Sequence, residues 1–297
     1  MIKYFLVVSF LSVSHSILAV SVLDDEKKTI ELSQPAQRVI TLAPSLTEMI
    51  YSIGAEDKLV ATVQFSNFPE AAKTKPHIGN YERFIMERLL SYKPDLVIAW
   101  SSANNRQQLK QLEKLNIPVY RSEPRELTDI SRTIKNLGIL TGHQPKAEQV
   151  ASNFNQRLQK LQKDNQDKTE LNAFYQVWHQ PVYTINGQHA ISKVMRLCRL
   201  RNVFENALII APKVTVESVI KHNPDVIIAS GMASAQPEWL DKWREWSTIN
   251  AVKHENLFFI HPDLIQRQSP RIMDAAEIMC KQADEARLKL KKRDQTH

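Results

Sequence analysis

Glycine is scarce in this sequence. The chain has 6 glycines in 297 residues, whereas an average content of about 7% would give about 20. No two of them lie within three residues of each other. The phosphate-binding loop of Walker-type nucleotide sites, the dinucleotide-binding fingerprint and the G-x-S-x-G turn around a nucleophilic serine all need clustered glycines. The sequence therefore excludes these three kinds of site.

Cysteine is almost absent too. The chain has two, Cys198 and Cys280, whereas structural zinc sites and iron–sulfur clusters usually need more. They are either two inert buried thiols or one disulfide, and the redox compartment decides between these. None of the nine histidines lies in an H-x-x-x-H or H-E-x-x-H pattern. We therefore predict no metal site, no bound cofactor and no enzymatic activity.

The N-terminus has the order of an export signal. Lys3 is followed by the mostly apolar stretch 4–13 and then by small residues at 14, 16 and 19. About ten apolar residues cannot span a bilayer, which takes about 20, but a basic, then apolar, then small order is typical of a signal peptide. We predict that residues 1–19 are a signal peptide cleaved near Ala19. Export leads to an oxidising compartment, so a Cys198–Cys280 disulfide is expected.

The net charge does not indicate nucleic-acid binding. It is +7 at pH 7, but basic residues are interspersed with acidic ones along most of the chain. The densest basic run, 289–293, ends a helical pattern, where cations stabilise the helix dipole. We expect no nucleic-acid partner.

Strand-like and helix-like segments alternate along the chain. Ser45-Leu-Thr-Glu48 has the pattern of a capping box, with Gly54 as the C-terminal stop of the helix it opens. Alternation of this kind predicts βαβ units with a parallel sheet. The expected strands of the first half are 38–43, 58–63, 95–99 and 118–120.

One helix–strand unit occurs twice. Residues 86–100 align with 216–230 without a gap, which indicates two related halves. The stretch 144–166 lies between them and has apolar residues at helical spacing, enough for a helix about 30 Å long. The identical pairs in the repeat are Glu87 and Glu217, Pro94 and Pro224, Asp95 and Asp225, Ile98 and Ile228, and Ala99 and Ala229.

These features predict an α/β fold with two Rossmann-like lobes joined by one long α-helix. We expect an N-terminal lobe at 36–142, a connecting helix at 143–168 and a C-terminal lobe at 170–290. A cleft between two such lobes, at the carboxyl ends of the strands, is a preferred ligand site.

The chain resembles the helical-backbone (class III) substrate-binding proteins, and within them the cobalamin (vitamin B12) branch that serves bacterial ABC importers. The resemblance covers roughly 36–286, and both cysteines fall where that branch has its disulfide. The segments that carry it are Arg38–Glu48, Gln64–Pro69, Lys93–Trp100 and Ser269–Ile272.

The resemblance implies a function in transport. A protein of this kind captures cobalamin or a related corrinoid in the periplasm and delivers it to an inner-membrane permease dimer. ATP is used by the importer's separate ATPase subunits, and the membrane is contacted only through the permease. One surface glutamate per lobe pairs with permease arginines, and the matching positions are Glu87 and Glu217. The simpler interpretation of each is a first-turn carboxylate that stabilises the helix dipole.

The resemblance also implies pocket residues. Aromatic positions of the family's pocket match Phe65, Tyr81, Trp100 and Tyr183, and a binding segment matches Asp263-Leu264-Ile265-Gln266-Arg267. Trp100 could instead cap a core strand, and Asp263 with Arg267 could be a local ion pair. The family's pocket tyrosine is Phe65 here, and a tryptophan of the second lobe is replaced near Ala211, so this pocket has fewer aromatic rings and one fewer hydroxyl.

Several alternatives stay open at this point. Haem or ferric-siderophore binding in the same fold would use Tyr81 as an iron ligand. An exported enzyme, or an adhesion or scaffold module, is less favoured, because no catalytic pattern is present and an adhesion module would not need paired glutamates. Trp239, Trp243 and Trp246, opened by Pro237, have helical spacing, which predicts packing on the second lobe rather than a ligand wall.

Overall fold

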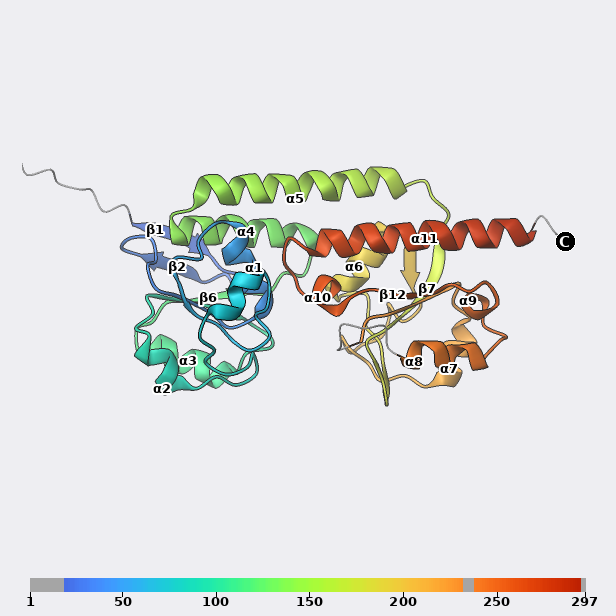
Figure 1. Cartoon of the computed structure of the whole chain (residues 1–297), viewed down its shortest axis with the longest axis horizontal. Coiled ribbons are helices and arrows are strands. Elements are labelled where there is room, and N and C mark those ends of the chain that lie inside the picture. Colours follow the sequence, from blue (N-terminus) through green and yellow to red (C-terminus); the bar gives the residue numbers. More distant parts are fainter. Residues whose placement is uncertain (1–18, 232–237, 295–297) are drawn as a thin grey trace, which may run out of the picture.

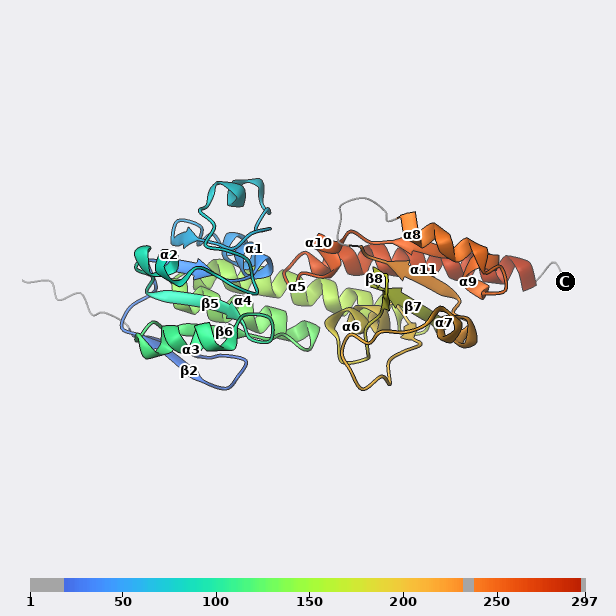
Figure 2. The same cartoon turned by 90° about the horizontal axis from the view of Figure 1, so that it is seen from below.

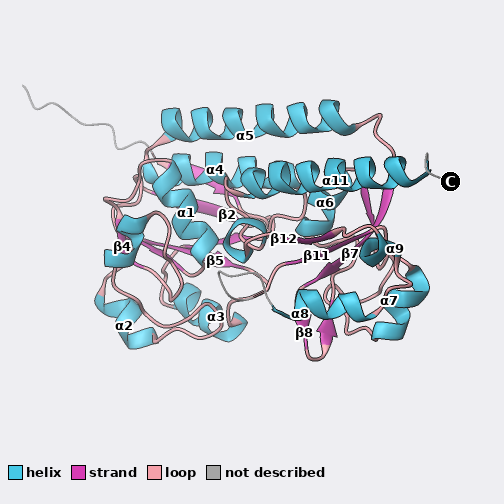
Figure 3. Cartoon of the chain, turned by 45° about the vertical axis from the view of Figure 1, so that its right-hand side comes forward, coloured by secondary structure: helices cyan, strands magenta, loops and turns pink. Residues whose placement is uncertain are grey.

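Two α/β lobes lie side by side along the long axis of the molecule. The computed structural model describes residues 19–231 and 238–294, so Pro237 and nearly all of the predicted signal peptide lie outside the described residues. Long helices run along one side of both lobes, and the sheets lie beneath them (Figures 1 and 3). No helix in the described ranges is long and apolar enough to be a membrane span.

The N-terminal lobe contains a four-stranded parallel sheet in the order β4-β3-β5-β6. Helices alternate with these strands, and a hairpin, β1 (Val20–Leu23) with β2 (Thr29–Leu32), precedes them. The strands are β3 (Val39–Thr41), β4 (Leu59–Ala61), β5 (Leu96–Trp100) and β6 (Val119–Ser122). The helices are α1 (Pro44–Ser52), η1 (Glu70–Thr74), α2 (Met86–Ser91), α3 (Arg106–Lys114) and α4 (Leu127–Thr141).

The C-terminal lobe repeats this sheet. Its parallel order is β10-β7-β11-β12, so in both lobes the first strand in sequence lies between the second and the third. The strands are β7 (Leu171–Gln176), β10 (Leu200–Asn202), β11 (Val226–Ala229) and β12 (Leu257–Phe259), with a hairpin of β8 (Trp178–His179) and β9 (Val182–Tyr183). The helices are α6 (Ala190–Leu197), α7 (Val216–His222), α8 (Glu238–Asp241), η2 (Lys242–Glu245), α9 (Asn250–Lys253), α10 (Pro262–Ile265) and α11 (Ile272–Asp294). The predicted fold class is confirmed.

Helix α5 (Gln144–Asn165) extends from one lobe to the other alongside α4 and α11 (Figure 1). Its 22 residues make a rod of about 33 Å. At its start it crosses α4 closely: a Cβ on Gly138 would lie 2.3 Å from the Cβ of Ala147. The lobe boundaries drawn from the sequence stay predictions.

One hydrophobic core runs through both lobes. It includes Leu137 of α4, Phe154 of α5 and Met279 of α11. Each lobe adds a smaller core on the other face of its sheet. Because apolar packing along α4, α5 and α11 is continuous, relative motion of the lobes would disturb close-packed side chains.

The tryptophans of the second lobe pack into its core, as predicted. Trp243 is buried, and Trp239 and Trp246 pack against the same cluster. The indole N–H of Trp243 donates a hydrogen bond of 2.7 Å to Gln176 Oε1. The stripe is not one helix, because α8 gives way to the 3₁₀ turn η2 between the first and second tryptophan.

The disulfide expected from the export signal is present. Cys198, at the C-terminal end of α6, is bonded to Cys280 in α11 with an S–S distance of 2.00 Å. Both residues are buried. The bond ties the last helix to the helix that precedes β10.

The predicted capping box is wrong. Helix α1 begins at Pro44, one residue before Ser45, and has no side-chain cap. Proline suits this position because its missing N–H would have had no partner in the first turn. The expected stop is close to correct, since the helix ends at Ser52 and Gly54 follows with a positive φ of 74°. The side chain of Glu48 does not cap the helix and points toward the other lobe.

Candidate functional site

The two lobes meet through a group of polar side chains, which we call the interlobe network. From the N-terminal lobe it takes Glu48 of α1 and the turn 65–67 that follows β4. From the C-terminal lobe it takes residues 263–271, which follow β12. Both segments lie after the carboxyl ends of parallel strands, the edge at which α/β proteins usually bind ligands.

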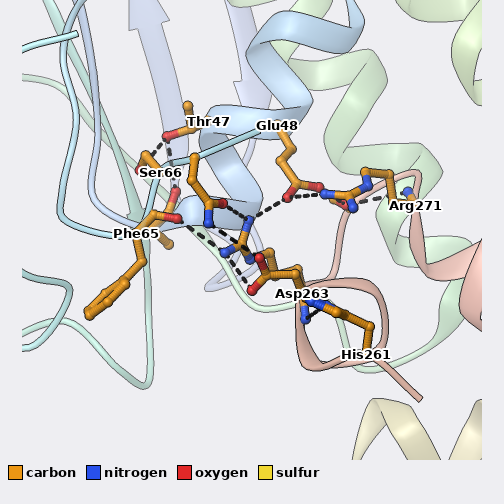
Figure 4. A network of polar contacts seen from close by, with 11 residues as sticks. Thr47, Glu48, Phe65, Ser66, His261, Asp263 and Arg271 are labelled. Atoms are coloured by element: carbon orange, nitrogen blue, oxygen red, sulfur yellow. Dashed lines mark hydrogen bonds and ion pairs between the residues drawn. The ribbon is translucent and has the colours of Figure 1, made fainter. Parts of the chain in front are cut away.

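Glu48 is the centre of the network. Its side chain is 2% exposed. Oε1 accepts hydrogen bonds from Arg267 Nη1 at 2.8 Å and from Arg271 Nη1 at 3.0 Å, and Oε2 accepts one from Ser269 Oγ at 2.5 Å. Burying a carboxylate is costly unless it is paired and hydrogen-bonded. Here all three donors come from the opposite lobe (Figure 4).

Arg267 makes further contacts with the N-terminal lobe. Its Nη1 also donates to Asn67 Oδ1 at 2.8 Å. Its Nη2 donates to the backbone carbonyl of Phe65 at 3.1 Å and to Asp263 Oδ1 at 2.7 Å. Four acceptors thus surround one guanidinium whose side chain is 10% exposed. The predicted pair of Asp263 and Arg267 does lie together, and the arginine is largely engaged by protein atoms.

The turn at Phe65 combines an unusual backbone with an exposed ring. Phe65 has a φ of 65°, a left-handed conformation that non-glycine residues seldom adopt. The residue is 67% exposed, and its ring points away from the polar contacts (Figure 4). The next residue is held by Thr47, whose Oγ1 donates to Ser66 Oγ at 3.1 Å. The turn is therefore built from buried polar contacts and presents an aromatic side chain to solvent.

The remaining predicted aromatics lie on both lobes. Trp100 ends β5, and its ring centroid is 6.3 Å from that of Tyr81; both rings are half-buried. Burial, with the nearby Glu82, raises the pKa of Tyr81. Tyr183 is half-exposed on the β8–β9 hairpin of the other lobe.

Within the predicted binding segment the side chains diverge. Asp263 and Leu264 are partly exposed, but Ile265 is buried in the core. Gln266 faces its own lobe, where Nε2 donates to Ser230 Oγ at 2.8 Å. In this structure Asp263, Leu264 and Gln266 are the partly exposed residues of the segment, and Ile265 and Arg267 are buried.

Glu87 and Glu217 occupy equivalent places in the two lobes. Each is exposed and is the second residue of its helix, α2 or α7. Both helices lie on the side of the molecule away from α5 (Figure 1). Hydrogen bonds from its own backbone N–H and from the Thr215 hydroxyl lower the pKa of Glu217, so this carboxylate is charged at neutral pH.

Glu48, Asn67 and Arg271 are site residues that the sequence did not predict. Glu48 had been assigned to a local cap, and Arg271 stood only inside a family motif. Among the described residues, no group of three or more His, Cys, Asp or Glu side chains is placed to hold a metal ion.

Residues 39–264 match the periplasmic binding protein family. The chain belongs to this family. A curated vitamin B12-binding protein of Vibrio cholerae is 33% identical to this binding protein over 83% of this chain and 88% of its own length. That of Yersinia pestis is also 33% identical, over 84% and 87%. Members of the family are periplasmic and deliver ligands to ABC transporters.

Solved structures agree on the fold of this binding protein. The crystal structure of the periplasmic vitamin B12 binding protein BtuF of Vibrio cholerae superposes with a TM-score of 0.79 at 31% identity, covering 85% of this chain and 98% of that one. The periplasmic heme-binding protein RhuT of Roseiflexus has a TM-score of 0.75 at 18% identity, covering 84% and 99%. This second match shows the fold alone.

Proposed function

We propose that this binding protein captures cobalamin, or a related corrinoid, in the periplasm and delivers it to an ABC permease of the inner membrane. The observation that carries the proposal is the similarity to vitamin B12-binding proteins over most of the chain. The protein would be a carrier and not an enzyme, with cobalamin as cargo and no cofactor of its own. Residues 1–19 would direct export and be removed.

The strand ends suit a corrinoid. Such a ligand is large, with apolar edges and amide groups, so its site needs aromatic walls and a few polar anchors. Phe65, Tyr81 and Trp100 would form the wall on the first lobe, and Tyr183 would face them from the second. The segment 263–267 would contribute mainly through its partly exposed residues Asp263, Leu264 and Gln266, because Ile265 and Arg267 are buried.

The paired glutamates support delivery. A permease built of two identical subunits presents two equivalent surfaces, and a protein with one exposed carboxylate on each of two similar lobes can meet both. Glu87 and Glu217 would pair there with basic residues. Contact with the membrane would pass through the permease, whose ATPase subunits would supply the energy.

Haem or ferric-siderophore binding is the alternative. It would need the phenolate form of Tyr81 to coordinate iron. Curated vitamin B12-binding relatives are 33% identical to this chain, whereas the heme-binding structure is 18% identical. The similarity therefore favours the corrinoid.

A pair of titrations tests the proposal. The chain without residues 1–19 is titrated with cyanocobalamin and separately with haemin, following tryptophan fluorescence and the visible spectrum. We expect saturable cyanocobalamin binding with a Kd of about 1 μM or lower. A Kd of 1 μM corresponds to a binding free energy of about −8 kcal/mol. Binding of haemin at that level without any response to cyanocobalamin would reject the corrinoid in favour of the alternative.

A further inference from the structure

In the interlobe network, the carboxylate of Glu48 lies between two arginine side chains. One oxygen, Oε1, accepts from Nη1 of Arg267 and from Nη1 of Arg271. Two guanidinium groups therefore share a single acceptor at close range. Like charges repel, and they do so more strongly where water is excluded. Without the carboxylate charge, the two arginines would move apart.

Arg267 has a second role, because its guanidinium also contacts the Phe65 turn. Its Nη2 donates to the carbonyl of Phe65, and its Nη1 donates to the side chain of Asn67. The backbone N–H of Asn67 donates to that same carbonyl at 2.9 Å. A left-handed non-glycine residue persists only where its surroundings hold it. Displacing Arg267 would remove two of the contacts that hold the Phe65 turn.

From these contacts we infer that Glu48 is a positioning residue for the ligand wall. It keeps Arg267 in place, Arg267 holds the carbonyl of Phe65, and the turn then presents the Phe65 ring to solvent, where a ligand can reach it. The direction of an aromatic side chain on one lobe is thus set by cations of the other lobe. This inference rests on the proposed function, because it assigns a task to the same site. It also gives Arg267 a different role from the direct ligand contact expected from sequence.

A double-mutant cycle measures this coupling. The variants are Glu48→Gln, Phe65→Ala and the double substitution, and the readout is the Kd for cyanocobalamin. We expect Glu48→Gln to weaken binding about tenfold or more when Phe65 is present, and less than about twofold when it is alanine. An equal loss in both backgrounds would overturn the inference, because a general structural role does not depend on the ring.

Hydrogen exchange of the unliganded protein gives an independent readout. In Glu48→Gln the amides of Ser66 and Asn67 should exchange faster, while those of the core strand β5 keep their wild-type protection. Glu48→Asp retains the charge and should restore part of the protection. Unchanged exchange at 66–67 in Glu48→Gln would also overturn the inference.

Two further variants keep the test interpretable. Lys193→Gln removes another ion pair between the lobes, with Glu126, and should leave both readouts at the wild-type level. If Glu48→Gln does not fold, Ser269→Ala removes one donor to Glu48 and should give a smaller change in the same direction. If the wild type binds neither cyanocobalamin nor haemin, the proposed function fails, and hydrogen exchange alone decides the role of Glu48.

Discussion

The ring of His189 closes the first turn of α6. Its Nδ1 accepts a hydrogen bond of 3.1 Å from the backbone N–H of Ile191. Burial lowers the pKa of His189 from its ordinary 6.5 to about 4. As the pH falls, His189 therefore becomes protonated near pH 6.5 in the unfolded chain but only near pH 4 in the folded protein. The contribution of His189 to the free energy of unfolding is fully present above about pH 6.5 and is lost as the pH falls toward 4.

We expect His189→Asn to reduce this pH dependence, since asparagine keeps an N-cap acceptor without titrating. When the pH is lowered from 7 to 4.5, the unfolding free energy of the wild type should fall by about 2–3 kcal/mol more than that of the variant. Urea denaturation at both pH values measures the difference. Equal losses in both proteins would show that His189 titrates normally.

Glu48 shows where prediction of single residues stops. Ser45-Leu-Thr-Glu48 fits a capping box because that pattern is judged within four residues. The actual partner of Glu48, Arg267, lies 219 residues away. Only the fold brings the two together. The aromatic positions are predicted by resemblance alone, whereas the polar contacts that orient Phe65 needed three-dimensional information.

Among the helices and strands, local signals sufficed for the main plan. The helix expected at 144–166 is α5, Gln144–Asn165, because its apolar spacing is uninterrupted over many turns. The four strands expected in the first half are β3 to β6, shifted by one or two residues at their ends. The hairpins β1–β2 and β8–β9 were not predicted, because their strands are only two to four residues long and give little periodicity.

The crossing of α4 and α5 depends on a glycine. We expect Gly138→Ala to destabilise the protein by about 1–3 kcal/mol, because its Cβ would meet that of Ala147 at 2.3 Å. Adding Ala147→Gly should recover part of the loss, since it removes the clashing atom. Unfolding in urea gives both values. If the second substitution makes the protein still less stable, the contact is not the cause.

The disulfide between α6 and α11 is the covalent link of the second lobe. It spans 82 residues, for which the chain-entropy model gives about 4.5 kcal/mol. We expect Cys198→Ser with Cys280→Ser to lower the unfolding free energy by about 2–5 kcal/mol. Urea denaturation of the oxidised wild type and the variant measures this. The reduced wild type should resemble the variant, and a difference of more than about 1 kcal/mol between them would point to packing at the serines.

At the scale of the whole molecule, the two lobes have the same sheet topology and are held in one orientation. They share the strand order and lie side by side, as the view from below also shows (Figure 2). A single core along α4, α5 and α11 joins them. Such continuity favours small hinge motions over wide opening, so the distance between Glu87 and Glu217 should change little on ligand binding. A rigid spacing of this kind suits a partner with two equivalent docking surfaces.

Reversing both charges tests that arrangement. We expect Glu87→Lys with Glu217→Lys to reduce uptake of cyanocobalamin in cells about tenfold or more, because like charges would oppose the permease. The Kd of the purified protein should stay within about twofold, since neither residue belongs to the network around Phe65. Uptake is measured with labelled cyanocobalamin in cells whose own binding protein is deleted.

A matched variant separates docking from net charge. Glu31→Lys with Glu148→Lys makes the same change in charge at two other exposed positions, one on β2 and one on α5. If docking uses the α2 and α7 surfaces, this control transports like the wild type. If both double variants lose uptake equally, long-range electrostatics explains the loss. If neither does, the carboxylates serve only the dipoles of their own helices, and the permease must recognise another surface of the two lobes.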